Sequence, residues 1–292
     1  MRFGILVPQT GPWHVLLERC LEVERLGYES LWIGDHYFLE PLPQFELFEA
    51  MTVLGGIAVS VPRVRFGAMT TNVIYRNPAV IAKQAATLDQ MSGGRFELGL
   101  GAGVYESDHR MTGSAPWSPR ERVDRFEEIL AVIDPLLRGE RVDHDGAYYR
   151  VAGGLVRPRP IQQPRPPITV GANGPRMLRL AAQRADRWNT WGGRGLSAEE
   201  LWSATAARVR LFNDAVSAAG RDPRSVVRSL YVYRPLEPWS SPVAFEAIVE
   251  HARSIGLDEL ILAWPGFLQE DGAEAQLDVF RTVSHELVPL LV

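Results

Sequence analysis

A strand, a helix and a second strand between residues 63 and 103 constrain the fold of this chain most. Two short apolar runs, 64–69 and 96–101, flank a segment that opens at Asn77-Pro78 and stops at Gly93-Gly94. Proline in the first turn and glycine beyond the last turn are typical start and stop signals of a helix. Strands joined by a helix pair in parallel, because a tight turn can only reverse the chain. The segment therefore predicts a parallel sheet.

The same alternation of strand and helix continues along the chain. The apolar runs that predict buried strands are 3–8, 30–34, 64–69, 96–101, 168–171, 187–191, 226–234 and 259–264. The helices that we expect after them are 13–26, 46–60, 78–92, 119–137, 175–185, 197–219, 242–254 and 273–290. Eight strands, each followed by a helix, are typical of a closed (β/α)8 barrel, or TIM barrel. The predicted fold class is therefore α/β, a TIM barrel.

One segment interrupts this repeat, at about residues 138–167, after the fourth helix. It contains a predicted hairpin tip at 144–149 and a proline-rich strap at 157–167. We expect a short insertion within a single domain that spans residues 1–292. An open, doubly wound sheet is the alternative fold, but residues 8–12 lack the glycine-rich phosphate loop that follows its first strand.

Composition and charge disfavour several classes of partner. The net charge is −4 and no block of like charges occurs, so nucleic-acid binding is disfavoured. No apolar stretch approaches about 18 residues, which predicts neither a signal peptide nor a membrane span. The single cysteine, Cys20, forms no internal disulfide and fits a reducing compartment. We therefore expect a cytoplasmic protein without a nucleic-acid or membrane partner.

In a TIM barrel the site is built from the residues that follow the carboxyl ends of the strands. Here these are Gln9, Asp35 and His36, then 68–72, 101–105, 172–175 and 189–193. Most are small, polar or glycine, and such strand ends let a flat ligand approach the backbone. A metal site would need clustered His, Asp and Glu there. Only His36 of the six histidines qualifies, so we expect no metal.

Several motifs occur in order between residues 3 and 189. They are Gly27-Tyr28-Glu29-Ser30-Leu31-Trp32 leading into Asp35-His36, Arg76-Asn77-Pro78-Ala79, Ser92-Gly93-Gly94-Arg95, Leu98-Gly99-Leu100-Gly101-Ala102-Gly103 and Ala185-Asp186-Arg187-Trp188-Asn189. Together they resemble the bacterial luciferase-like monooxygenase superfamily, most of all its coenzyme F420-dependent oxidoreductase branch. The resemblance implies a (β/α)8 barrel with an insertion, which binds a flavin or a deazaflavin at its mouth. The last third of the chain matches only in its alternation of strand and helix.

The resemblance also implies roles for individual residues. His36 matches a histidine beside the reacting edge of the ring, which acts as proton donor, acceptor or orienter; an ordinary pKa of about 6.5 suits this task. Asp35 is expected to fix the loop and to orient the imidazole. Several family members have a non-prolyl cis peptide behind the ring, and the matching bond here is Ala68-Met69.

The other residues that the resemblance assigns to the cofactor follow four strands. They are Thr70, Thr71 and Asn72 at the ring, Gly101, Ala102, Gly103 and Val104 along the ring and ribityl chain, Asn173 and Gly174 at the phosphate, and Ala172 and Thr190 beside them. Family members that oxidise glucose 6-phosphate carry an acidic glutamate at the Val104 position. The valine here therefore argues against that substrate.

Three functions follow from the resemblance. The first is hydride transfer between coenzyme F420 and a small organic substrate. The second is an FMN-dependent monooxygenase that receives reduced flavin from a separate reductase, with the 104–117 loop or the 138–167 insertion as a lid against water. The third is a non-catalytic flavin-binding barrel, against which the intact Asp35-His36 motif argues. The resemblance also allows a homodimer.

Overall fold

A computed structural model describes residues 1–39, 44–193, 195–266 and 273–291. The chain forms two compact units. The first unit comprises 1–8, 18–32 and 172–292, and the second comprises 9–17 and 33–171. Among the described residues, no helix is both long enough and apolar enough to cross a membrane.

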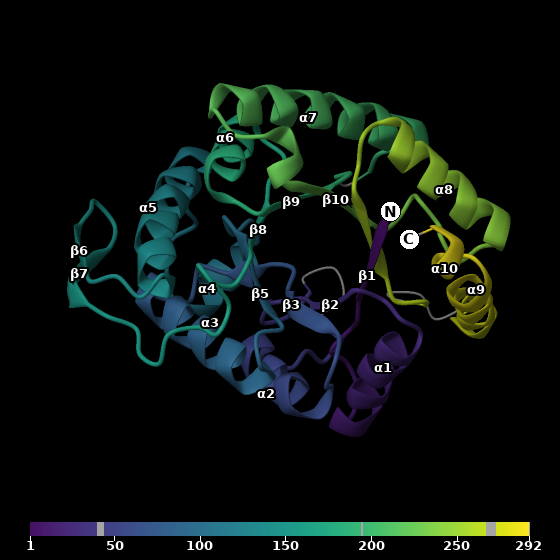
Figure 1. Ribbon diagram of the computed structural model, residues 1–292, viewed down its shortest axis with the longest axis horizontal. Helices are drawn as coiled ribbons and strands as arrows, with labels where there is room; N and C mark the ends of the chain where they lie inside the picture. Colours follow the sequence, from purple (N-terminus) through teal and green to yellow (C-terminus); the bar gives the residue numbers. More distant parts are fainter. Residues whose placement is uncertain (40–43, 194, 267–272, 292) are drawn as a thin grey trace. The chain divides into compact units, whose positions relative to one another are not determined.

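The first unit contains a parallel sheet with the strand order β2-β1-β11-β10-β9 (Figure 1). The strands are β1 (Arg2–Leu6), β2 (Ser30–Ile33), β9 (Arg187–Trp191), β10 (Val227–Val232) and β11 (Glu259–Ala263). Its helices are α1 (Trp13–Arg25) from residue 18 onward, α6 (Pro175–Arg184), α7 (Ala198–Ala218), α8 (Pro242–Ser254), α9 (Ala273–Glu286) and α10 (Val288–Leu291), with a 3-10 turn at Pro223–Ser225. Consecutive residues of β11 are buried, as the continuous apolar run predicts for a parallel strand that is covered on both faces.

The second unit contains a parallel sheet of β3 (Arg65–Ala68), β5 (Phe96–Gly101) and β8 (Ile168–Gly171), in that order. A two-residue strand, β4 (Thr71–Asn72), also pairs with β5. The helices are α2 (Ala50–Ser60), α3 (Pro78–Ser92), α4 (Glu106–Met111) and α5 (Pro119–Leu137). Helix α3 packs beside α2 and α5 (Figure 1).

Helix α3 has the bounds that its sequence signals predict. The Asn77 side chain accepts a hydrogen bond from Ala79 N at 2.9 Å, Pro78 occupies the first turn, and Gly93 ends the helix with φ 68°. These contacts satisfy end groups that the helix itself leaves unpaired. The helix therefore places the ends of β3 and β5 side by side.

The insertion at 138–167 forms an antiparallel hairpin of β6 (Val142–Asp145) and β7 (Arg150–Gly154), followed by the strap. The hairpin lies on the outer side of α5 (Figure 1). On α5, the Glu128 carboxylate accepts hydrogen bonds from the backbone N–H groups of residues 147–149. On α3, the Asp89 carboxylate accepts from Ile161 N and Gln162 N. Two carboxylates thus anchor the insertion to neighbouring helices.

Two short elements of the second unit were not predicted. Strand β4 has only two residues, and helix α4 has six and begins at Tyr105 without a side-chain cap. Neither is long enough to show a hydrophobic period. Both lie at the strand ends where the site was expected.

A polar cluster at the strand ends as the candidate active site

His36 lies against a buried carboxylate that the sequence did not point to. His36 follows β2, and Asp108 lies on α4, which follows β5. His36 Nδ1 is 3.1 Å from Asp108 Oδ2. The Asp108 side chain is 1% exposed and the His36 side chain is 26% exposed. One edge of the imidazole is therefore held in the interior, and the ring still reaches the surface.

The Asp108 carboxylate has two further donors. Asn72 Nδ2, at the end of β4, donates to Oδ2 at 2.6 Å. The Tyr37 backbone N–H lies 3.4 Å from Oδ1. The ring of Tyr105 stands edge-on to the imidazole, with 4.6 Å between the ring centroids. Residues from three strand ends therefore fix His36 in place.

Asp35 has a different set of partners. It accepts from Asn72 N at 2.7 Å, from Tyr75 OH at 2.6 Å and from Arg76 Nη1 at 2.5 Å. Burial lowers the pKa of Arg76, yet the contacts with Asp35 and Glu49 together raise it above the ordinary value. Asp35 therefore fixes the segment after β4, as expected. The prediction that it orients the imidazole is wrong, because Asp108 is the carboxylate at Nδ1.

The non-prolyl cis peptide is Met69-Thr70 and not the predicted Ala68-Met69 bond. Met69 N still donates a hydrogen bond to Ile33 O, at 2.8 Å, along the neighbouring strand β2. The cis bond therefore lies one residue further from the end of β3, at Ala68, than predicted.

The ends of β3 and β5 leave an open surface of small residues. Met69, Thr70 and residues 101–103 are half-buried. A Cβ atom on Gly101 would lie 2.1 Å from Thr70 Oγ1, and Gly103 has φ +72°. Only glycine fits both positions without rearrangement. Val104, the next residue, is 65% exposed.

Three of the predicted ring contacts are turned inward. Ala68, Thr71 and Asn72 are 1%, 0% and 5% exposed. Thr71 Oγ1 is buried and has no hydrogen-bond partner among the residues that the structure describes. A flat ring at this surface would therefore meet Met69, Thr70 and the glycines, and not these three side chains.

Four other predicted residues form a group in the first unit, at the start of α6. Thr190 Oγ1 donates to Asn173 Oδ1 at 2.8 Å, and Asn173 Nδ2 donates to Trp191 O at 3.2 Å. Ala172 N donates to the backbone of β9. Gly174 precedes the helix, and no side chain caps its amino terminus. An uncapped helix start is a favourable place for an anion.

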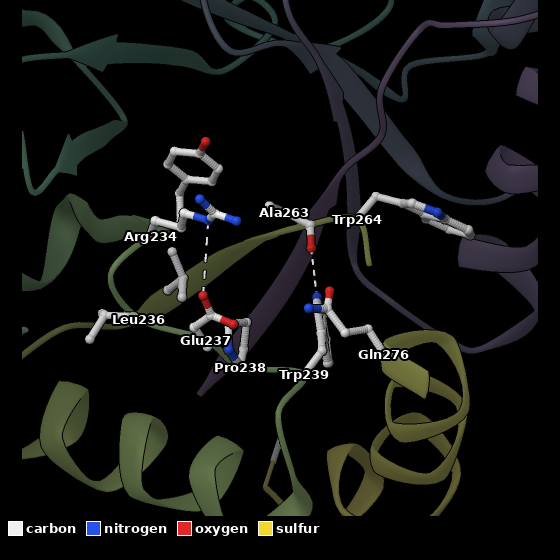
Figure 2. Close-up of a pocket in the computed structure, with 10 residues that line it drawn as sticks. Arg234, Leu236, Glu237, Pro238, Trp239, Ala263, Trp264 and Gln276 are labelled. Atoms are coloured by element: carbon white, nitrogen blue, oxygen red, sulfur yellow. Dashed lines mark hydrogen bonds and ion pairs between the residues drawn. The ribbon is translucent and has the colours of Figure 1, made fainter. Parts of the chain in front are cut away.

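The first unit also holds a small cavity at the ends of β10 and β11 (Figure 2). Trp239, Trp264 and Arg234 line it, and Trp239 Nε1 donates to Ala263 O at 2.7 Å. Its volume is about 30 Å³, which accommodates water but not a tricyclic ring. It includes none of the predicted site residues.

Comparison with known proteins places the chain in a family. The family described as luciferase-like monooxygenase matches residues 1–236. The chain belongs to this family. It is 34% identical over 226 residues to the F420-dependent glucose-6-phosphate dehydrogenase of Microbacterium testaceum, covering 76% of this chain and 64% of the relative. It is 34% identical over 222 residues to the phthiodiolone/phenolphthiodiolone dimycocerosates ketoreductase of Mycobacterium tuberculosis, covering 69% and 55%. The chain thus spans less than two thirds of the length of these curated relatives.

Solved structures of similar fold superimpose over the full chain. The F420-dependent tetrahydromethanopterin reductase from Methanopyrus kandleri superimposes with a TM-score of 0.80 at 20% identity, covering 100% of this chain and 99% of that one. An F420-dependent secondary alcohol dehydrogenase in complex with an F420-acetone adduct gives 0.82 at 18%, with 100% and 99% covered. The FMN-bound oxygenating constituent of 3,6-diketocamphane monooxygenase, from Pseudomonas putida, gives 0.77 at 17%, again with 100% and 99% covered. These likenesses confirm the predicted (β/α)8 barrel and exclude the open sheet.

Sequence reasoning missed Asp108. Its contact with His36 spans 72 residues of chain, and α4 is too short to show a pattern. One signal was available: Asp108 follows the glycine-rich end of β5 within the same loop that supplies Tyr105. An acidic residue so close to a strand end is a candidate partner for the one histidine at such an end.

Proposed function

We propose that this protein is an oxidoreductase that transfers a hydride between coenzyme F420 and a small organic substrate. The observation that carries the proposal is the imidazole of His36, anchored through Nδ1 to a buried carboxylate and still partly exposed. Proton transfer beside a hydride carrier requires such a group. Relatives named as F420-dependent dehydrogenases and reductases support the choice of cofactor.

The residues at the strand ends suit a flat, tricyclic ring. The Thr70 side chain lies so close to Gly101 that no Cβ fits at that position, and Met69, Thr70 and residues 101–103 are half-buried. We assign Met69, Thr70 and residues 101–103 to the ring. When bound, the deazaflavin supplies two-electron hydride chemistry, because its ring has carbon where flavin has N5.

The phosphate of the cofactor suits the start of α6. Gly174 precedes an uncapped helix terminus, and the Thr190 hydroxyl fixes the Asn173 side chain next to it. Backbone N–H groups at such a terminus bind anions. We therefore assign Ala172, Asn173, Gly174 and Thr190 to this part of the cofactor.

The proposed substrates are alcohols or carbonyl compounds, since their interconversion moves one hydride and one proton. His36 takes the hydroxyl proton in the oxidation and returns it in the reduction. Glucose 6-phosphate is not favoured, because position 104 is an exposed valine and offers no acid.

Cofactor titration tests the proposal. Purified protein is titrated with F420 and, separately, with FMN, and fluorescence follows binding. Binding of F420, followed by its reduction with an alcohol from a panel of secondary alcohols, supports hydride transfer. Binding of neither cofactor contradicts the proposal and favours a non-catalytic barrel.

The family description itself favours a second candidate, an FMN-dependent monooxygenase that a separate reductase supplies with reduced flavin. A monooxygenase of this kind consumes oxygen and forms an oxygenated product when reduced FMN is provided. Binding of FMN alone, together with oxygen consumption, would replace the first proposal by the second.

A further inference from the structure

We propose that Asp108 is a positioning residue that holds the neutral imidazole of His36 as the Nδ1–H tautomer. Nε2 is then the bare nitrogen that accepts the proton of the substrate. The inference rests on the proposed function only in naming the substrate as the source of that proton. The tautomer itself is a property of the cofactor-free protein.

The partners of the Asn72 amide determine its orientation. Asn72 Oδ1 lies 3.0 Å from Ile74 N, and a backbone N–H can only donate. The amide oxygen must therefore face Ile74, which turns Nδ2 toward Asp108. This removes the usual ambiguity between the two ends of an amide.

The Asp108 carboxylate determines which nitrogen of the imidazole carries the proton. Asp108 Oδ2 accepts from Asn72 Nδ2 at 2.6 Å and lies 3.1 Å from His36 Nδ1. An ionised carboxylate has no proton to give, so Nδ1 must donate. A bare Nδ1 would set two lone pairs against each other at this distance.

The imidazole of His36 also contacts an aromatic ring. The Tyr105 ring packs edge-on against the imidazole at an interplanar angle of 72°, which restricts its rotation. Within the described ranges, Nδ1 makes the one hydrogen bond recorded for the His36 ring. With Nδ1 committed to Asp108, Nε2 is the nitrogen left for a substrate.

The tautomer determines which direction of proton transfer the neutral protein supports. In the oxidation of an alcohol, the C–H bond breaks and its electron pair leaves as hydride to the oxidised deazaflavin. The O–H proton passes to Nε2, and the C=O bond forms. The resulting imidazolium lies against the Asp108 carboxylate, which stabilises it. Carbonyl reduction is the reverse and starts from the imidazolium.

Nitrogen NMR of the ¹⁵N-labelled, cofactor-free protein tests the assignment. The His36 signals are identified by their absence in His36→Gln, since the chain has six histidines. In spectra of the neutral ring, we expect a protonated Nδ1 and a bare Nε2. A protonated Nε2 in the wild-type protein would overturn the inference, whether or not any variant folds.

Three variants on α4 sharpen the test. Asp108→Asn removes the acceptor charge and should shift the tautomer population toward Nε2–H, whereas Asp108→Glu keeps a carboxylate and should retain Nδ1–H. Glu106→Gln removes an exposed carboxylate from the same helix and should change nothing. An unchanged tautomer in folded Asp108→Asn would contradict the role of Asp108.

Kinetics give an independent measurement once an F420-dependent activity is in hand. We expect Asp108→Asn to lower kcat by about 10²-fold, with a smaller effect on KM and an altered pH profile. Unchanged kcat and pH profile would contradict a positioning role. A failure to bind F420 would instead contradict the proposed function and leave the NMR result standing.

Discussion

Two carboxylates of the second unit are equally buried but have different surroundings. Asp35 and Asp108 are each 1% exposed. Among the described residues, the donors on Asp35 belong to residues 72–76, which are themselves largely enclosed. Asp108 shares its oxygens with His36, whose side chain reaches the surface. One carboxylate is connected to the interior and the other to an accessible imidazole.

This difference shows that burial and charge do not by themselves identify a functional carboxylate. The Arg76 guanidinium on Asp35 is 6% exposed, so this ion pair holds the chain after β4 and offers nothing to a ligand. Asp108 acts through the one partner that a ligand can touch. Neutralising Asp35 should therefore lower stability, and neutralising Asp108 should lower activity.

The largest expected effect is that of His36→Ala on turnover. If His36 transfers the proton, the substitution should lower kcat by about 10²- to 10⁴-fold while the protein remains folded. His14→Ala is the matched control, because His14 is exposed on α1 and should leave turnover unchanged. Equal turnover in wild type and His36→Ala would make His36 a spectator.

The next effect compares Asp35→Asn with Asp108→Asn in urea unfolding. Asp35→Asn leaves the buried Arg76 charge with Glu49, which is half-exposed, as its remaining carboxylate partner, so we expect a loss of about 3 kcal/mol in unfolding free energy. Asp108→Asn leaves neutral or partly exposed donors and should cost only about 1–2 kcal/mol. If Asp108→Asn were the more destabilising variant, the division between a structural and a functional carboxylate would fail.

The elements with local signals were predicted well. Helix α3 and strands β5 and β8 have their predicted bounds, because caps, proline, glycine and apolar runs act over a few neighbouring residues. His36 was selected as a candidate for the same reason, as the one histidine that follows a strand end. Such features need no knowledge of distant contacts.

The partner of His36 could not be found in this way. Asp35 was chosen because it is adjacent in sequence, but its carboxylate accepts hydrogen bonds from residues 72–76 and not from the imidazole. Asp108 is 72 residues away from His36 and lies on a helix too short for a period. The cis peptide was predicted one residue too early. Met69 N donates a hydrogen bond to Ile33 O of β2, a contact between distant residues that the sequence does not show, and the cis bond follows Met69.

The smallest effect concerns a third carboxylate, Glu128, which anchors the hairpin and has no contact with His36. Burial raises its pKa, but donation from the Tyr148 and Tyr149 N–H groups and from His144 brings the pKa below the ordinary value of 4.5. A depressed pKa in the folded state means that the contribution to stability is present above pH 4.5. It is lost as the pH falls through the folded value.

Glu128→Gln should therefore lower the unfolding free energy by about 1 kcal/mol at neutral pH, and the gap to wild type should close as the pH falls below the ordinary value of 4.5. Turnover should not change, since the anchored hairpin is remote from the imidazole. Glu127→Gln, at the exposed neighbouring position, should show neither the loss nor the pH dependence. A constant gap across this pH range would mean that the hydrogen bonds need no charge on Glu128. A loss of turnover would mean that carboxylates without an accessible partner also serve the reaction, which would break the distinction drawn between Asp35 and Asp108.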